Sequence, residues 1–322
     1  MKQRLAFVVN SHGYIAHFLP IIQNMPDIHP IIFTPLKLTA DYARDVLKLD
    51  AVHGLRDEHV WEAIREAGIK NVVICYQKIA GDCKGLNTMQ IFHGVSFKGD
   101  CLANWNPERW RHVFVQGEHF WEPYVRRFAS HRHKIRRVEF ARMPLYRDVP
   151  AWDRTKPILY MPTHRDGGLA TLRQNINLVC ESGLPVVIKL HPINMRDDSF
   201  MRLVTPTILQ SKNVQLITPD DLRYFNYHEL FFKSSVLVSD FSSVACEYTL
   251  TDRPIVILRG GMRTVKRGWQ HFDRHLFHCG ERRDLRHTVA DAKRKFVPGT
   301  YPRLFIEEDC VSMVQAIQEA MV

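Results

Sequence analysis

Two histidines follow apolar runs of this chain at points where a buried strand would end. MQIFHGVSFK, residues 89–98, passes from an apolar run into His93 and Gly94, with Lys98 close behind. PVVIKLH, residues 185–191, ends in the same way at His191. An imidazole with a pKa near neutrality can take a proton from a hydroxyl group or donate one to a phosphate oxygen. His93 and His191 are therefore the candidate catalytic residues.

Other polar residues in similar positions suit a phosphate-bearing substrate, which would be the donor in a group transfer. The planar fork of an arginine matches phosphate oxygens, and a lysine can neutralise their charge. Arg165 follows the apolar run 157–162, and Lys189 lies just before His191. The candidate donor-binding residues are Lys98, Thr163, Arg165, Lys189, Asp240, Ser242, Ser243 and Glu247.

The segment VLVSDFSSVACEYTL, residues 236–250, predicts a strand, a tight turn and the start of a helix. A helix N-terminus presents free backbone N–H groups and partial positive charge, which suit a phosphate. Ser242 and Ser243 would add hydroxyl donors there, although either serine could instead be an ordinary helix N-cap. Glu247, one turn later, could bind a ribose or sugar hydroxyl, or be an ordinary acidic residue of the first turn.

These residues need a scaffold, and the pattern of apolar runs predicts one. The runs cover residues 5–10, 30–34, 71–76, 89–93, 112–117 and 136–141, and then 157–162, 185–191, 214–219, 236–240 and 254–260. Most are continuous rather than alternating, as expected for strands buried on both faces of a parallel sheet. Helical patterns such as 40–49 and 57–68 lie between them, so the fold class is α/β.

A segment rich in proline and charge, residues 143–157, divides the pattern almost in half. We therefore expect two Rossmann-like parallel-sheet domains, residues 1–150 and 151–322, facing a central cleft. The amphipathic last stretch, residues 311–322, could pack back on the N-terminal domain.

Ligands of parallel sheets bind outside the carboxyl ends of the strands. His93 would then face the phosphate site from the N-terminal, acceptor-side domain. Ser11 and His12, which follow the first strand, are the other acceptor-side candidates.

The composition narrows the class of protein. Of the 322 residues 45% are hydrophobic and 24% charged, as in a folded globular protein. No apolar stretch is long enough to span a bilayer, and the first apolar run, of about five residues, is too short for a signal peptide, so we expect a cytoplasmic location.

The motifs GxGxxG and GxxxxGK[ST] are absent, which argues against dinucleotide enzymes and P-loop kinases. No Asp-rich cluster indicates an obligatory metal, and no cofactor is expected.

The net charge of +10 favours an anionic partner. The charge gathers in three basic clusters, residues 125–142, 259–269 and 281–295. With aromatic residues interleaved, they suit the anionic inner face of a cell membrane, where the protein would be peripheral. Nucleic acid is not an expected partner, and the oligomeric state is open.

Four segments, taken together, resemble the CDP-glycerol glycerophosphotransferases, which prime and polymerise the glycerol phosphate chains of teichoic acids and related capsule polymers. QIFHGVSFK resembles their Q-x-x-HG-x-x-x-K segment, and LYMPTHRD resembles L-Y-x-P-T-aromatic-R-D. VVIKLHP resembles K-x-HP, and VLVSDFSSVACEYTLTDRPIVIL resembles S/T-D-Y-S-S…E…x-x-P-hydrophobic. The segments occur in family order between residues 89 and 260.

This resemblance implies a GT-B-like fold with CDP-glycerol bound mainly by the C-terminal domain. Its pyrophosphate would lie at Ser242 and Ser243, with His93 as the catalytic base and His191 assisting at the phosphate. The implied reaction transfers glycerol phosphate, or the phosphate of ribitol or another polyol, to a lipid-linked sugar or a growing polymer, and CMP leaves.

Two other functions remain open on the residues alone. A GT-B nucleotide-sugar glycosyltransferase or a UDP-sugar epimerase could use the same serine pair for a UDP pyrophosphate. A non-enzymatic basic protein that binds nucleic acid or membrane would not need His93 or His191. The nucleotide that is released, and the effect of replacing the histidines, distinguish the three.

Overall fold

The computed structural model describes residues 2–9, 12–53, 56–75, 79–92, 106–163, 168–224, 226–240, 242–258, 270–280, 284–301 and 310–321. The chain divides into two compact units. Unit 1 contains the described residues up to Arg147 together with residues 310–321, and unit 2 contains those from Asp148 to Tyr301. The predicted fold class, two α/β units with parallel sheets, is confirmed.

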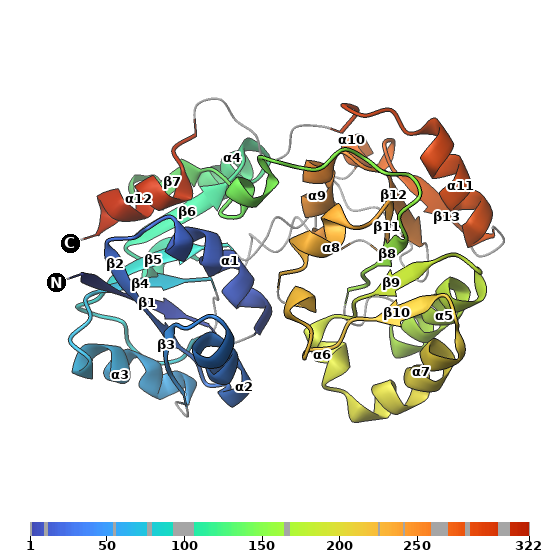
Figure 1. Cartoon of the computed structure of the whole chain (residues 1–322). Helices are drawn as coiled ribbons and strands as arrows, with labels where there is room; N and C mark the ends of the chain where they lie inside the picture. The colour runs from blue at the N-terminus through green and yellow to red at the C-terminus, as the bar shows by residue number, and fades with distance from the viewer. Residues whose placement is uncertain are drawn as a thin grey trace. The chain divides into compact units, whose positions relative to one another are not determined.

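Unit 1 is built on a sheet of seven parallel strands in the order β3-β2-β1-β4-β5-β6-β7 (Figure 1). Every residue of β4 and β5 is buried, so both faces of these central strands are covered. This burial explains the apolar residues that follow Asn71 in β4. The buried polar residues of β5, Asn87, Thr88 and Gln90, are instead hydrogen-bonded. The strands are β1 (Gln3–Val8), β2 (Ile28–Phe33), β3 (Asp50–Val52), β4 (Asn71–Ile74), β5 (Asn87–Ile91), β6 (His112–Gln116) and β7 (Ile135–Val138).

The helices of unit 1 follow the predicted pattern with shifted ends. The stretch 40–49 contains the last two residues of α2 and a π-helical turn, Tyr42–Val46, and the stretch 57–68 contains α3. The chain leaves α3 at Gly68, whose φ of 65° suits glycine. The helices are α1 (His12–Gln23), α2 (Lys37–Asp41), α3 (Val60–Glu66), α4 (Glu118–Arg127) and α12 (Met313–Ala320), with short turns η2 (Asp57–His59), η4 (Pro107–Arg109), η5 (Ala129–Lys134) and η6 (Met143–Tyr146).

The last helix, α12, belongs to unit 1. Its N-cap Ser312 accepts a hydrogen bond from the backbone N–H of Gln315 at 3.1 Å. The Asn87 side chain donates to the carbonyl of Ala320 at 2.6 Å, and Arg136 pairs with Glu319 at 2.5 Å. Contacts from β5 and β7 therefore anchor the end of the chain.

Unit 2 contains six parallel strands in the order β10-β9-β8-β11-β12-β13. Its core is formed by residues of β8, β9, β11 and β12 together with residues of α5, α7 and α11. The strands are β8 (Ile158–Tyr160), β9 (Val186–Ile188), β10 (Val214–Leu216), β11 (Val236–Ser239), β12 (Ile255–Leu258) and β13 (Phe277–Cys279). The helices are α5 (Gly168–Glu181), α6 (Pro192–Met195), α7 (Asp198–Gln210), α8 (His228–Phe232), α9 (Ser243–Tyr248), α10 (Gln270–Asp273) and α11 (Leu285–Lys295), with turns η7 (Leu222–Tyr224) and η8 (Thr249–Thr251).

A fully buried arginine joins three segments of unit 2. The Nη1 of Arg253 donates to the carbonyls of Phe231 at 2.7 Å and Ser234 at 2.8 Å, and its Nη2 donates to the carbonyl of Pro150 at 2.8 Å. Burial lowers the pKa of Arg253. Because these carbonyls lie at the end of α8 and at the entry of the chain into unit 2, Arg253 fixes where the unit begins.

We predict that Arg253→Met destabilises the protein by about 3 kcal/mol or more, because three carbonyls lose a charged donor. The free energy of unfolding, measured in urea, checks this. Arg286→Met, at an exposed position of α11, is the matched control and should change stability by less than about 0.5 kcal/mol. Equal effects of the two changes would contradict the role of Arg253.

Candidate functional site

The residues after β8, β9 and β11 lie together at the carboxyl edge of the unit 2 sheet. These strands are neighbours in the order β9-β8-β11, and all are parallel, so they end at the same edge. Thr163 follows β8, Lys189 and His191 follow β9, and Asp240 and Ser242 follow β11. The structure therefore brings these five predicted site residues to one edge.

Asp240 ties the end of β11 to the end of β8. Its Oδ1 and Oδ2 accept the backbone N–H of Thr163 at 2.9 and 3.0 Å, and Oδ2 also accepts the Thr163 hydroxyl at 3.1 Å. Asn194 of α6 donates to the Thr163 carbonyl at 3.5 Å. A carboxylate occupied in this way positions the loop after β8, and its negative charge is unsuited to direct contact with a phosphate.

His191 is the N-cap of α6. Its Nδ1 accepts the backbone N–H of Ile193 at 3.2 Å, and Pro192 occupies the first helical position. Because Nδ1 is an acceptor, the neutral ring carries its proton on Nε2. His191 thus has an N–H donor on the ring atom away from the helix, which suits a phosphate or a leaving oxygen.

Ser242 has the N-cap role that was the alternative interpretation of the serine pair. Its Oγ accepts the backbone N–H of Val244 at 3.3 Å, and its own N–H donates to the carbonyl of Asp240 at 2.7 Å. The hydroxyl hydrogen remains available as a donor, because a serine can accept and donate at once. Ser243, the first residue of α9, is half-buried.

Lys189 and Glu247 are two buried charges that meet the same tyrosine. The Lys189 Nζ lies 4.2 Å from the ring centroid of Tyr224 and 5.4 Å from that of Tyr227. The Tyr227 hydroxyl donates to Glu247 Oε2 at 2.8 Å. Lys189 is 6% and Glu247 4% exposed, so the aromatic rings and the hydroxyl replace water around both charges.

The two tyrosines and Asn194 were not identified from the sequence. Tyr224 ends a short 3₁₀ turn after β10, and Tyr227 immediately precedes α8. Burial raises the pKa of the Tyr224 hydroxyl, which therefore stays protonated. The only signal in the sequence is two tyrosines in the loop after a strand, and without knowledge of Lys189 as their neighbour it is too weak to use.

Five predicted site residues cannot be placed. His93, Lys98, Ser11 and Arg165 lie outside the described residues, and for His12, the first residue of α1, the side chain does too. Their roles remain predictions. Among the described residues, no group of three or more His, Cys, Asp or Glu side chains could hold a metal ion.

Buried amides fix the backbone of unit 1 as far as residue 92. Gln90 donates through Nε2 to the carbonyls of Ile74 at 3.2 Å and Ile91 at 2.6 Å. Gln116 donates to the carbonyl of Phe92 at 3.1 Å. The chain is thus held in a defined path at the carboxyl end of β5.

The turn that carries Tyr224 depends on an ion pair. Asp221 Oδ1 accepts the backbone N–H of Arg223 at 2.8 Å, and Oδ2 lies 2.5 Å from Arg223 Nη2. The hydrogen bond from Arg223 lowers the pKa of Asp221. The carbonyl of Asp221 also accepts the backbone N–H of Tyr224 at 2.8 Å. The Asp221–Arg223 ion pair therefore stabilises the turn that presents the Tyr224 ring to Lys189.

We predict that Asp221→Asn lowers the free energy of unfolding by up to about 1 kcal/mol at neutral pH. The folded-state pKa of Asp221 is depressed, so its contribution is present above about pH 4 and is lost as the pH falls through that folded pKa. The difference in the free energy of unfolding between Asp221→Asn and the wild type should therefore disappear at acidic pH. Asp220→Asn, at an exposed neighbouring position, should show no such pH dependence, and a difference that persists in acid would rule out the ion pair as its cause.

Residues 142–264 match the family model of the CDP-glycerol:poly(glycerophosphate) glycerophosphotransferases. The matched range contains Thr163, Lys189, His191, Asp240 and Ser242 and excludes residues 89–98. No curated protein matches the chain by sequence.

Solved structures resemble almost the whole chain. UDP-N-acetylglucosamine 2-epimerase from Rickettsia bellii has a TM-score of 0.63 at 11% identity, covering 99% of this chain and 93% of that one. The wall teichoic acid polymerase TagF has a TM-score of 0.62 at 15% identity, covering 91% and 81%. S. aureus MnaA with UDP has a TM-score of 0.59 at 11% identity, covering 91% and 87%. At these identities the likeness concerns the fold, which is GT-B-like as predicted.

The family match and the residues at the carboxyl edge of unit 2 agree with the family resemblance predicted from the motifs. Residues 142–264 are therefore similar to the CDP-glycerol:poly(glycerophosphate) glycerophosphotransferase family, and over that range the chain is CDP-glycerol glycerophosphotransferase-like.

Proposed function

We propose that the protein transfers glycerol phosphate, or a similar polyol phosphate, from CDP-glycerol to a hydroxyl of a lipid-linked sugar or a growing cell-surface polymer. The observation that carries this proposal is the placement of His191, Lys189 and Ser242 at one sheet edge inside the range that matches the family. A TagF structure with a TM-score of 0.58 to this chain was soaked with CDPG, which supports the same class of donor.

The proposed reaction is a direct displacement at the β-phosphorus of the donor. His93 takes the proton of the acceptor hydroxyl, and that oxygen forms the new bond to the β-phosphorus. The bond from the β-phosphorus to the oxygen bridging the two phosphates breaks, and the electron pair leaves with CMP. The Nε2–H of His191 donates to the phosphate oxygens as negative charge builds up on them.

Cationic and hydroxyl groups of the chain bind the donor in this proposal. Lys189 neutralises part of the pyrophosphate charge, with Lys98 and Arg165 as further cations. Ser242 and Ser243 donate hydroxyl hydrogens to it, and Glu247 accepts from a donor hydroxyl. Thr163 and Asp240 position the loop after β8, Ser11 and His12 lie on the acceptor side, and no resident metal is required.

Two substitutions of His191 separate its chemistry from its capping role. Asparagine can still accept the Ile193 N–H but lacks the Nε2–H, whereas alanine lacks both. We predict that His191→Asn and His191→Ala both lower kcat for CMP release by about 100-fold or more. Only His191→Ala should also lose stability, by about 1 kcal/mol. A wild-type rate in His191→Asn would show that the residue is a cap alone.

The same assay tests the donor. CDP-glycerol, CDP-ribitol and UDP-sugars are supplied in parallel with a lipid-linked acceptor. Acceptor-dependent CMP release supports the phosphotransferase, whereas turnover of a UDP-sugar alone would favour the glycosyltransferase or epimerase, whose fold the chain shares.

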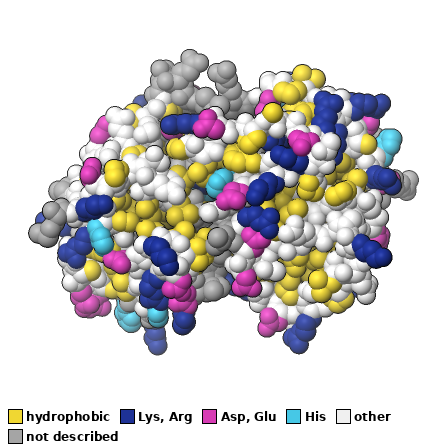
Figure 2. All heavy atoms as spheres, in the orientation of Figure 1, with side chains coloured by type: hydrophobic (Ala, Val, Ile, Leu, Met, Phe, Trp, Pro, Cys, Tyr) yellow, Lys and Arg dark blue, Asp and Glu magenta, His cyan; other side chains and the backbone are white. Residues whose placement is uncertain are grey.

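We further propose a cytoplasmic protein that is peripheral on the anionic inner face of the membrane. In the described part of the chain, no helix combines the length and hydrophobicity needed to cross a bilayer. Arg126 and Arg127 are exposed at the end of α4, and α11 ends in Lys293, Arg294 and Lys295. Figure 2 shows Lys and Arg side chains at several places on the face that it draws. Such surfaces suit anionic lipid headgroups.

Charge reversal tests this location. Arg126→Glu with Arg127→Glu should weaken binding to vesicles containing phosphatidylglycerol by about tenfold or more, at roughly 1 kcal/mol per basic residue. Cosedimentation measures the binding, and added salt should weaken it for the wild type. Lys48→Glu, at an exposed position elsewhere in unit 1, is the control. Equal binding to neutral vesicles would argue against an electrostatic membrane site.

A further inference from the structure

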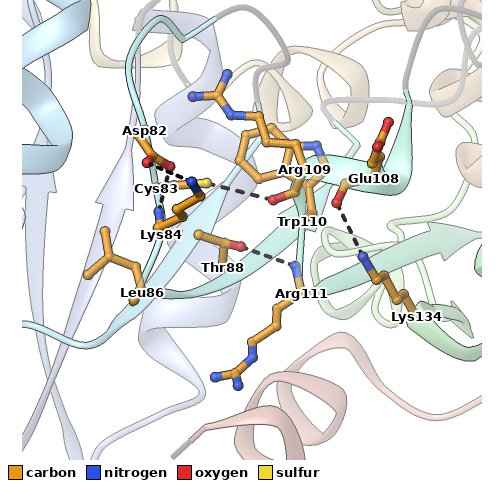
Figure 3. Close-up of a pocket in the computed structure, with 11 residues that line it drawn as sticks. Asp82, Cys83, Lys84, Leu86, Thr88, Glu108, Arg109, Trp110, Arg111 and Lys134 are labelled. Carbon is orange, nitrogen blue, oxygen red and sulfur yellow. Dashed lines mark hydrogen bonds and ion pairs between the residues drawn. The ribbon is translucent and has the colours of Figure 1, made fainter.

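Unit 1 has a pocket of about 590 Å³ at the amino edge of its sheet, where β5, β6 and β7 begin (Figure 3). Lys84 precedes β5, Arg111 precedes β6 and Lys134 precedes β7, and all three line it. The strands are neighbours and parallel, so this edge is opposite to the carboxyl edge at which β5 leads toward His93. The pocket is therefore separate from the proposed catalytic edge.

One wall of the pocket is rigid. The Arg109 guanidinium donates to the carbonyls of Ile79 and Gly81 and lies over the rings of Trp61 and Trp110, 5.5 and 5.1 Å from their centroids. Gly81 has a φ of 87°, and a Cβ there would be 2.9 Å from the Glu58 carbonyl oxygen, so only glycine fits. A wall held in place by its own hydrogen bonds and ring contacts lowers the entropic cost of binding.

The other cationic side chains of the pocket, those of Arg111, Lys134 and Lys84, make few contacts with the protein. The backbone N–H of Arg111 donates to the hydroxyl and the carbonyl of Thr88. Within the described residues, the guanidinium of Arg111 makes no hydrogen bond or ion pair. Lys134 donates to the carbonyl of Glu108 at 3.2 Å. Lys84 Nζ lies 3.8 Å from Asp82 Oδ2, and its side chain is 90% exposed. Their charge is thus available to an anion.

Two carboxylates, of Asp82 and Glu108, line the same pocket. They would repel a bare phosphate, but they can accept hydrogen bonds from hydroxyl groups. A ligand that carries both phosphate oxygens and hydroxyls satisfies both sets of residues. We propose that this pocket binds a phosphodiester-linked polyol, the chemical class of the polymer product. The assignment of that ligand to the product chain rests on the proposed function.

Direct binding of a short synthetic glycerol phosphate oligomer to the full chain, by calorimetry, tests the proposal. The measurement needs no donor and no turnover, so its failure is distinguishable from failure of the proposed reaction. Lys84→Gln with Arg111→Gln should weaken binding about tenfold, equivalent to roughly 1.4 kcal/mol. Lys48→Gln is the matched control: Lys48 is exposed and precedes β3 at the same sheet edge, four strands from β5, and the control should bind as the wild type does.

Asp82→Asn separates hydroxyl recognition from simple attraction. Asparagine keeps an oxygen for the backbone N–H of Lys84, which Asp82 Oδ1 accepts at 2.9 Å, and it removes one negative charge. Simple electrostatics predicts tighter binding of the anionic oligomer to this variant, whereas loss of a hydroxyl acceptor predicts weaker binding. We expect weaker binding, with unchanged thermal unfolding.

Several results would overturn the proposal. The oligomer could fail to bind, Lys48→Gln could weaken it as much as the pocket variant, or Asp82→Asn could tighten it. Inorganic phosphate binding as tightly as the oligomer would indicate a bare anion site. If the pocket variant lost binding to vesicles of phosphatidylglycerol and phosphatidylcholine but kept the oligomer, the ligand would be a lipid headgroup.

Discussion

The Asp240 carboxylate connects the two central strands on which the carboxyl edge of unit 2 depends. Parallel strands bring their ends to one edge, but the loops that follow them are free to diverge. Three hydrogen bonds from Thr163 to Asp240 prevent this between β8 and β11. Asn194 extends the connection to α6, which His191 caps. The orientation of the His191 ring thus depends on a network that begins with one carboxylate.

The same edge of unit 2 buries two opposite charges, those of Lys189 and Glu247. Lys189 lies against the faces of Tyr224 and Tyr227, and Glu247 accepts from the Tyr227 hydroxyl. A buried charge is tolerated only when other groups replace its hydration, and a tyrosine can do this for a cation through its ring and for an anion through its hydroxyl. Tyr227 thus contacts both buried charges, the Lys189 ammonium through its ring and the Glu247 carboxylate through its hydroxyl.

The two edges of the unit 1 sheet differ in chemistry. At the carboxyl edge, Gln90 and Gln116 fix the backbone that leads toward the proposed base. At the amino edge, the wall formed by Arg109, Trp61 and Trp110 supports a pocket with mixed charge. If both proposals hold, unit 1 contacts the acceptor chain at two places, which would favour acceptors long enough to reach both.

The sequence alone determined the α/β class, the central strands and a resemblance to one family over part of the chain. Continuous apolar runs identify β1, β4, β8 and β11 because strands buried on both faces have no polar alternation. The run 89–93 located β5, although β5 itself also contains buried polar residues. The edge strands β3 and β13 were missed, since they are short and partly exposed, with burial too incomplete to require an apolar run. Residues such as His191 and Ser242 were found because a polar residue directly after a buried strand is a local signal.

Only the tertiary structure decided which distant residues meet. The local signal of Tyr224, Tyr227 and Asn194 is too weak to use, because these residues matter through their contacts with Lys189, Glu247 and Thr163, which are remote in sequence. The placement of α12 in unit 1 depends on contacts of Asn87 and Arg136 with residues more than half a chain away. The pocket at the amino edge combines the starts of three strands. A sequence records neighbours along the chain, whereas hydrogen bonds, cation–π contacts and pockets depend on neighbours in space.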